Sequence, residues 1–81
     1  MKIILNYHKF LGKYINTEKY PSDSSIEVPS NCTVHDLIVL LEIPKDRQKS
    51  IVVHVNNEPT WNTTILSEND SVKLVTAIGG G

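Results

Sequence analysis

The clearest pattern in the chain is Thr33-Val34-His35-Asp36-Leu37-Ile38-Val39-Leu40-Leu41. Four of its apolar side chains recur at i, i+3, i+4 and i+7, the spacing of one face of an α-helix: Val34, Leu37, Ile38 and Leu41. The Thr33 hydroxyl can cap the free N–H groups of the first turn, and Asp36 follows in a shortened form of the capping box. Pro44 cannot continue a helix and biases Ile43 away from helical angles. The sequence therefore predicts one amphipathic helix over residues 34–42.

Short segments of alternating or β-branched residues surround this helix. Residues 2–8 alternate, so that Ile3, Leu5 and Tyr7 share one face of a strand. Residues 60–66 are predicted to form either a short strand or a single helical turn, with Trp61 as a core anchor. The other strands are predicted at residues 26–28, 51–55 and 72–77.

Turn-forming residues fill the connections. Residues 9–24 predict a loop with at most a short turn of helix, anchored by apolar residues that include Phe10. Residues 45–50 predict a charged connector, and residues 56–59 predict a turn. In the turn before the last strand, Asn69 is the residue best suited to a positive φ.

One amphipathic helix with four to five short strands predicts a two-layer α+β fold. The chain has 81 residues, which corresponds to one domain. The first and last strands are both apolar enough to lie side by side at the centre of the sheet. We therefore expect these two strands to run parallel.

The composition excludes several classes of protein. A net charge of −1 argues against a general electrostatic grip on nucleic acid or on an anionic membrane. The single cysteine excludes a disulfide framework, a four-thiolate iron–sulfur cluster and a Cys-rich zinc site within this chain. The apolar runs are too short to span a membrane, and the first residues turn polar too soon for a signal peptide. We expect a soluble, cytoplasmic protein.

Three of the four glycines are the last three residues, Gly79, Gly80 and Gly81. Three glycines at a fixed place arise by chance about 0.03% of the time. A frayed terminus and glycines added by cloning are the alternatives to a functional role. Because glycine lacks Cβ, its backbone can enter a channel too narrow for other residues. Residues 78–81 reach about 13–14 Å when extended, enough to carry a terminal carboxylate into another protein's active site.

A terminal carboxylate is a weak electrophile and must be activated before it reacts. Condensation with ATP in a partner enzyme gives an acyl adenylate, in which the nucleotide is a good leaving group. A sulfur nucleophile that displaces the nucleotide leaves a C-terminal thiocarboxylate, whereas an amine gives an isopeptide bond. The tail therefore predicts either a sulfur carrier or a protein modifier.

The predicted element order with a terminal diglycine resembles the ubiquitin-like sulfur carriers of the ThiS/MoaD type. This family comprises the thiamine-biosynthesis sulfur carrier and the small subunit of molybdopterin synthase. The resemblance implies a ubiquitin-like β-grasp domain over residues 1–77 and a flexible tail over residues 78–81. It is carried by Met1-Lys2-Ile3-Ile4-Leu5-Asn6, Thr33-Val34-His35-Asp36-Leu37-Ile38, Val53-His54-Val55-Asn56-Asn57-Glu58 and Asn69-Asp70-Ser71-Val72-Lys73-Leu74-Val75-Thr76-Ala77-Ile78-Gly79-Gly80-Gly81.

The resemblance implies a carrier that is a co-substrate and supplies no catalytic residue. Gly81 would hold the adenylate and then the thiocarboxylate, while Gly79 and Gly80 would thread the partner's channel. Ile78 would belong to an apolar docking patch on the sheet, together with the outward half of residues 51–55 or 72–77. No cofactor or metal would be bound by the chain itself.

The resemblance also implies three partners. The first is an adenylyltransferase of the ubiquitin-activating type, which uses ATP and magnesium. The second is a sulfur donor, either a cysteine desulfurase or a rhodanese-like protein, and the third is a sulfur-accepting synthase. Neither nucleic acid nor a membrane is among them.

The final sulfur acceptor stays open at this point. A triple glycine after an aliphatic residue, with no proline before it, slightly favours the thiazole of thiamine over molybdopterin. The chain length lies nearer the molybdopterin type, the family's frequent Gly-Asp turn is Asn69-Asp70 here, and another sulfur product fits the chemistry equally well. A ubiquitin-like modifier and a β-grasp binding module that does not use its tail are the alternatives. An independent enzyme is the least supported, because no nucleophile–base pair or phosphate loop is visible.

Three other features have a simpler interpretation. Cys32 precedes the helix, where the dipole could lower its pKa, but we expect a passive residue at a loop edge. The spacing of the three histidines matches no local metal-ligand pattern. The charge run over residues 45–49 is either a solvated loop or a contact with the activating enzyme.

Overall fold

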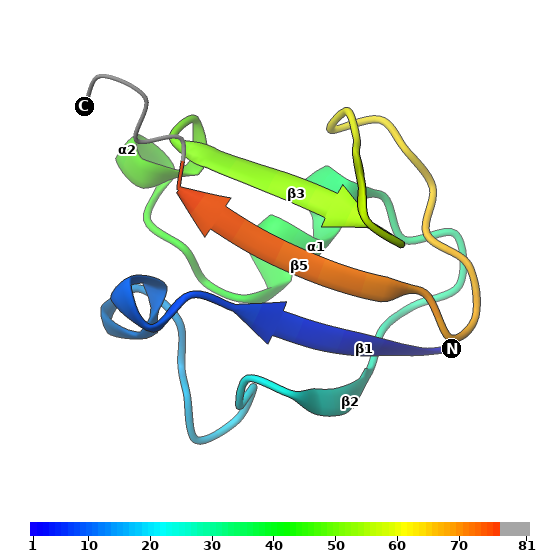
Figure 1. Ribbon diagram of the computed structural model, residues 1–81, viewed down its shortest axis with the longest axis horizontal. Coiled ribbons are helices and arrows are strands. Elements are labelled where there is room, and N and C mark those ends of the chain that lie inside the picture. Colours follow the sequence, from blue (N-terminus) through cyan, green and yellow to red (C-terminus); the bar gives the residue numbers. More distant parts are fainter. Residues whose placement is uncertain (77–81) are drawn as a thin grey trace.

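The structure, a computed structural model, describes residues 1–76. One helix, α1, packs across a sheet whose strands come from both ends of the chain (Figure 1). The α+β class and the β-grasp order predicted from the sequence are therefore confirmed. The elements are β1 (Lys2–Tyr7), the 3₁₀ helix η1 (Lys9–Lys13), β2 (Ser24–Glu27), α1 (Val34–Leu40), α2 (Lys45–Gln48), β3 (Ile51–Val55), β4 (Glu58–Pro59) and β5 (Ser71–Thr76).

The sheet is mixed, with five strands in the order β2-β1-β5-β3-β4. The two central strands, β1 and β5, run parallel, with Tyr7 opposite Leu74. β3 runs antiparallel to β5, with Ile51 opposite Thr76. The expectation that the first and last strands are parallel neighbours is confirmed. Among residues 1–76, no helix has both the length and the apolar character that a membrane span requires.

The start of α1 is the capping box that the sequence predicts. The Thr33 hydroxyl accepts a hydrogen bond from the Asp36 backbone N–H at 3.1 Å, and the Asp36 carboxylate accepts one from the Thr33 N–H at 3.1 Å. The helix ends at Leu40, two residues earlier than predicted. The reason is local: Glu42 has a φ of 62°, and its N–H bonds to the Val39 carbonyl at 3.0 Å in a tightened last turn.

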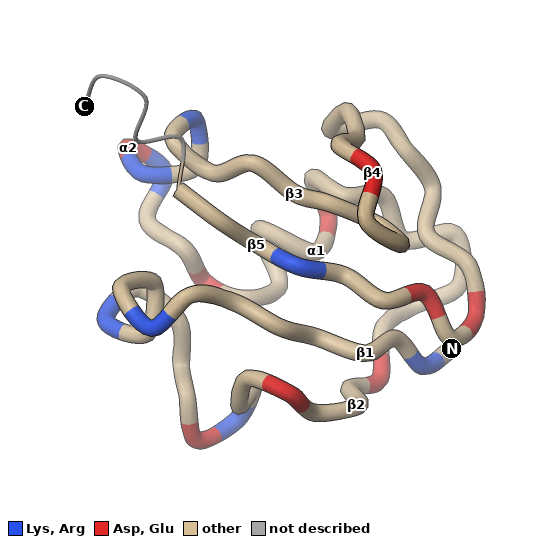
Figure 2. The backbone as a smooth tube through the Cα atoms, viewed as in Figure 1, with Lys and Arg blue, Asp and Glu red and all other residues tan. Residues whose placement is uncertain are grey.

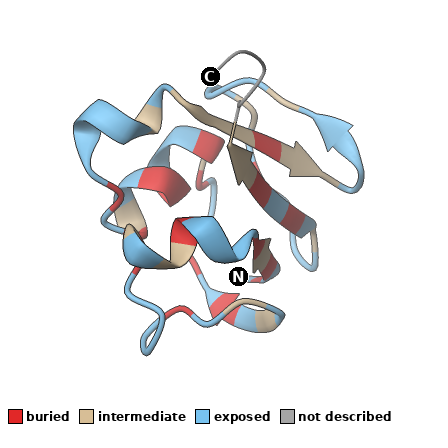
Figure 3. Ribbon diagram, turned by 60° about the vertical axis from the view of Figure 1, so that its left-hand side comes forward, coloured by how far each residue is buried: buried red, intermediate tan, exposed pale blue. Residues whose placement is uncertain are grey.

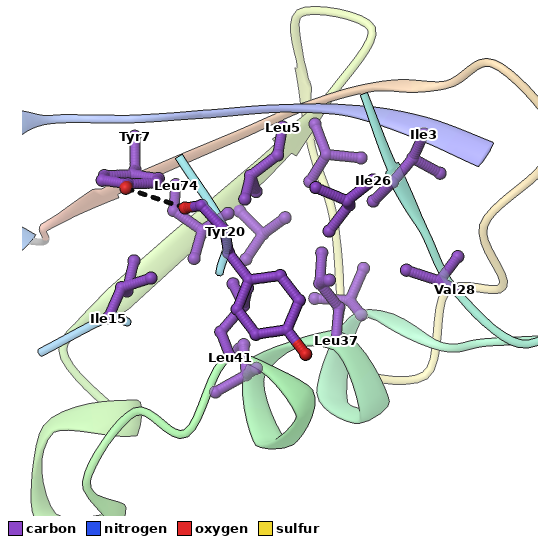
Figure 4. Packing of buried hydrophobic residues seen from close by; sticks show 14 of the residues in the cluster. Ile3, Leu5, Tyr7, Ile15, Tyr20, Ile26, Val28, Leu37, Leu41 and Leu74 are labelled. Atoms are coloured by element: carbon purple, nitrogen blue, oxygen red, sulfur yellow. Dashed lines mark hydrogen bonds between the residues drawn. The ribbon is translucent and has the colours of Figure 1, made fainter. Parts of the chain in front are cut away.

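The hydrophobic core lies between the sheet and α1, and Figure 3 shows the buried residues gathered there. β1 alternates as expected, because Ile3, Leu5 and Tyr7 are buried while the residues between them are not. Figure 4 shows the Tyr7 hydroxyl donating a hydrogen bond to the Tyr20 carbonyl, at 2.9 Å. This buried bond attaches the long connection after η1 to the central strand. Burial of the Tyr7 side chain also raises the pKa of its hydroxyl.

Two aromatic residues predicted as core anchors lie on the surface instead. Trp61 is 79% exposed, and Phe10 is 63% exposed. Trp61 opens a tight turn, in which the Thr64 N–H bonds to the Trp61 carbonyl at 3.0 Å, and Leu66 takes the place in the core. In η1, Leu11 is buried in place of its neighbour Phe10, because adjacent residues in a helical turn point in different directions.

The connections are more regular than the sequence indicates. The charged connector after Pro44 forms α2, and the predicted turn over residues 56–59 contains β4. Asn56 and Asn57 both have positive φ, 53° and 71°, as a tight hairpin turn requires. Residues 60–66 form a turn and an isolated bridge from Ile65 to Thr33. The prediction of a positive φ at Asn69 is confirmed, with a value of 66°.

Candidate functional site

The strand β5 ends at Thr76, and the predicted site residues follow it in the chain. Thr76 pairs with Ile51 at the start of β3, and the His8 N–H bonds to the Leu74 carbonyl at 3.3 Å. The end of β5 therefore lies between the start of β3 and the beginning of η1. The four residues predicted to form the tail lie outside the described residues: Ile78, Gly79, Gly80 and Gly81.

The face of the sheet opposite α1 presents the outward half of β3 and β5. Leu74 and Val53 are buried opposite each other, so strand alternation places Val75 and Val52 together on the outward face. Both valines are half-buried. Along the same face, Lys73 of β5 lies opposite His54 of β3. The sequence did not decide which outward-facing residues of the last strands belong to the docking patch. In the structure, this face has an apolar pair, Val52 and Val75, beside the end of β5 and a polar pair, His54 and Lys73, farther from it.

A shallow hollow of about 150 Å³ adjoins this apolar pair. It is lined by His8 and Phe10 on one side and by Val75 and Thr76 on the other. The rings of His8 and Phe10 lie 4.7 Å apart between centroids, and His8 Nδ1 accepts the Phe10 N–H at 3.2 Å. Ligand pockets usually measure about 300–1,000 Å³, so this hollow fits one side chain of a partner rather than a metabolite.

The cysteine noted in the sequence is buried beside the start of α1. Cys32 is 3% exposed, and burial, with a smaller effect of Asp36, raises the pKa of its thiol. The thiol donates to the Thr33 carbonyl at 3.4 Å, which agrees with the passive role expected for it. Within residues 1–76, His, Cys, Asp and Glu side chains form no group of three that could hold a metal ion. Next to the end of β5, the described part of the chain presents the apolar pair and the hollow.

Phe10 and His8 are the site residues that sequence reasoning missed. They fall in residues 9–24 and at the end of the first strand, where the pattern is least regular. One signal was available: Phe10 and Leu11 are adjacent, and adjacent residues of a 3₁₀ turn point in different directions, so a one-turn element with one side on the core favours burial of only one of them.

A mixed five-stranded sheet in this order, with one helix packed across it, defines a ubiquitin-like β-grasp protein. A family model, that of the ThiS family, matches residues 9–81, and the chain belongs to this family. Among curated proteins, none matches the chain significantly.

Solved structures support the same fold. The putative molybdopterin converting factor, subunit 1, from Pyrococcus furiosus superposes with a TM-score of 0.69 and 19% identity, over 94% of this chain and 97% of that one. The small archaeal modifier protein 1 of H. volcanii gives a TM-score of 0.66 and 16% identity, over 93% and 95%. A second crystal structure of that protein, from Haloferax volcanii, gives a TM-score of 0.63 and 16% identity over the full length of both chains.

Proposed function

We propose that this protein is a sulfur carrier whose Gly81 carboxylate is adenylated and then converted to a thiocarboxylate. The observation that carries the proposal is a chain of the ThiS family with three terminal glycines, which begin three residues after the last residue of the central strand β5. Glycines 79 and 80 would pass through the partner's channel, because a backbone without Cβ needs the least width.

The chemistry divides between this chain and its partners. In the adenylating partner, with ATP and magnesium, a Gly81 carboxylate oxygen attacks the α-phosphate and pyrophosphate leaves. The terminal persulfide sulfur of a cysteine desulfurase or a rhodanese-like protein then attacks the acyl carbon, and AMP leaves, which gives an acyl disulfide between the two proteins. A thiol of the partner or of the medium attacks the donor's sulfur of this disulfide, forms a new disulfide with the donor and releases the Gly81 thiocarboxylate. This chain supplies the carboxylate and the surface that positions it, so it acts as a co-substrate and not as an enzyme.

The docking surface is the apolar pair with its hollow. Val52 and Val75 form a flat apolar area, and the hollow beside Phe10 can receive one aliphatic side chain of the partner. Ile78, which follows two residues after Thr76, would extend this area toward the tail. Binding here holds the start of the tail against the mouth of the channel.

The thiazole of thiamine is the slightly favoured destination of the sulfur. The support is the aliphatic residue directly before three glycines, together with the ThiS family match. Molybdopterin is the alternative. Incubating the thiocarboxylated protein with a thiazole synthase or with a molybdopterin synthase large subunit separates the two, since only the correct acceptor consumes the thiocarboxylate.

The proposal is tested by mass spectrometry of the intact protein after incubation with the adenylating enzyme, ATP, magnesium and a sulfur source. We expect the mass to rise by the difference between sulfur and oxygen. A variant without Gly81 should show no increase while it keeps the unfolding midpoint of the full chain, because the proposal gives Gly81 a chemical role and not a structural one. Sulfur incorporation into the shortened variant, or none into the full chain, would disprove the proposal.

A protein modifier is the second candidate, favoured by the structural similarity to the small archaeal modifier protein 1. The chemistry is shared up to the adenylate, after which a lysine amine attacks in place of sulfur. Isolation of lysine-linked conjugates from cells, without detectable thiocarboxylate, would favour the modifier.

A further inference from the structure

Five of the eight lysines and arginines lie in two segments of the chain, η1 and α2 with the residue after it. Every one of these side chains is exposed. We call this set the basic collar, and its members are Lys9, Lys13, Lys45, Arg47 and Lys49.

The two halves of the collar lie side by side against one aromatic ring. Lys13 Nζ lies 5.4 Å from the centroid of the Tyr14 ring, and Arg47 Cζ lies 5.3 Å from the same centroid. Cation–π contacts at this distance are attractive. Tyr14 itself packs against the core, so the ring fixes both halves of the collar to the body of the domain.

The collar flanks the point where the chain leaves the sheet. Lys49 lies two residues before Ile51, which pairs with Thr76, and Phe10 of η1 lines the same hollow as Thr76. Figure 2 shows the Lys and Arg residues of η1 and α2 at this end of the sheet. A partner that receives the tail must therefore approach the collar.

The charge of the collar is largely uncompensated. Within residues 1–76, the salt bridge joins the Met1 ammonium to Glu27 at 2.9 Å, so no collar residue is paired with a carboxylate of this part of the chain. Asp46 lies within α2 and offsets one of the five positive charges.

The opposite end of the sheet carries more negative than positive charge, although Lys2 lies there and the Met1 ammonium is paired with Glu27. Glu68 accepts the Lys2 N–H at the start of β1, at 2.9 Å, and Glu58 pairs with the last residue of β3. Asp70 directly precedes β5. The small net charge of −1 thus conceals a positive end at the tail and a negative end away from it.

We infer that the basic collar docks on an acidic protein surface that surrounds the channel of the adenylating partner. This inference rests on the proposed function. Complementary charge attracts the tail end and repels the far end, so it raises the association rate and presents the tail toward the channel. The collar would act on encounter, whereas the apolar pair and the hollow would hold the complex.

A protein surface fits the collar better than a nucleic acid does. The five cations lie in and directly after two short elements beside the end of β5, whereas the outward face of the central strands β1 and β5 carries two separate lysines, Lys73 and Lys2. A stripe of cations along one face, as backbone binding requires, is not what this part of the chain presents.

The test compares two double variants with the same change in net charge. Lys45→Gln/Lys49→Gln removes two collar charges, and Lys2→Gln/Lys73→Gln removes two exposed charges elsewhere. Lys13 and Arg47 are left in place because they contact Tyr14. The unfolding midpoint of each variant is measured first. The association rate constant with the adenylating enzyme of the same organism is then measured by stopped-flow at low and high salt, with ATP–pyrophosphate exchange as the activity readout.

At about 20 mM salt we expect the collar variant to associate about five- to tenfold more slowly than wild type, and the control variant less than about twofold more slowly. At about 0.5 M salt the difference should disappear, because salt screens exposed charges.

Equal effects of the two variants on the association rate, or an association rate without salt dependence, would contradict the inference that the basic collar docks on an acidic surface. Either result would leave the proposed function intact. Binding of the wild type to a single-stranded oligonucleotide that the collar variant loses would assign the collar to nucleic acid and overturn it as well. An absence of pyrophosphate exchange with the wild type would overturn the proposed function, and the inference with it.

Discussion

Thr33 and Asp36 close a small hydrogen-bonded ring at the start of α1, with each side chain accepting the other's backbone N–H at 3.1 Å. The backbone bond from Thr33, followed by the bond with the Thr33 side chain, keeps the pKa of Asp36 below its ordinary value of 3.8. These bonds favour the charged carboxylate in the folded protein. Their contribution is fully present above the ordinary pKa and is lost as the pH falls through the lower folded-state pKa.

An Asp36→Asn variant should therefore be less stable than wild type near neutral pH, by an amount that shrinks as the pH falls below about 4. The measurement is the urea midpoint of both proteins at several pH values. Glu58→Gln, which removes an exposed carboxylate outside the ring, serves as the control and should show no such ring-dependent loss. A difference between wild type and Asp36→Asn that stays constant down to about pH 2.5 would contradict the assignment.

At the scale of a single element, α1 has a core face and a solvent face. Leu37 is 0% exposed, whereas Val39, two residues later on the same helix, is 53% exposed. The helical period separates these two positions onto opposite sides. Most of the stability that α1 contributes should therefore depend on one stripe of side chains.

We expect Leu37→Ala to lower the free energy of unfolding by about 2–5 kcal/mol, because it leaves a cavity between α1 and the sheet. Val39→Ala is the control and should change this free energy by less than about 0.5 kcal/mol. Urea unfolding followed by circular dichroism measures both. Similar losses for the two variants would mean that α1 packs on a different face.

The short elements η1 and α2 are too short to be predicted from hydrophobic periodicity. η1 contains two apolar residues and α2 contains none, too few to give a period, so the sequence predicts only a loop and a connector. Tertiary contacts hold them instead: Leu11 enters the core, and Arg47 of α2 lies 5.3 Å from the centroid of the Tyr14 ring. Elements of one turn depend on such contacts, because an isolated turn does not form a stable helix.

On the scale of the whole molecule, two exposed aromatic residues lie at opposite ends of the sheet. Phe10 lines the hollow beside the end of β5, and Trp61 follows β4, which pairs with the other end of β3. The proposed docking surface includes the first and excludes the second. The two residues therefore form a matched pair for testing which end meets the adenylating partner.

Phe10→Ala should lower kcat/KM for adenylation of the carrier by about tenfold, since it removes one wall of the hollow at the centre of the contact. Trp61→Ala should leave kcat/KM within about twofold of wild type. Pyrophosphate exchange at varied carrier concentration measures both. A larger effect of Trp61→Ala than of Phe10→Ala would move the docking surface to the opposite end of the sheet.

Much of the fold could be predicted from the sequence, whereas the docking surface could not. The helix, the main strands and the parallel pairing of β1 and β5 depend on regularly spaced apolar residues that must be buried. The docking surface joins His8 and Phe10 from one segment to Val75 and Thr76 from another. No local pattern indicates that these residues are neighbours, because the parallel register of β1 and β5 brings them together.

By itself, the sequence determined the fold class, the capping of α1 and a three-glycine terminus suited to a narrow channel. The cap and the glycines are local motifs, and the fold class follows from elements that are each recognised by a local pattern. Only the tertiary structure decided that Trp61 and Phe10 face solvent, that Cys32 is buried, and that five cations gather beside the end of β5. The physical reason is that burial and charge clustering depend on how segments distant in the sequence pack against one another. This packing exists only once the sheet and α1 are assembled around a common core.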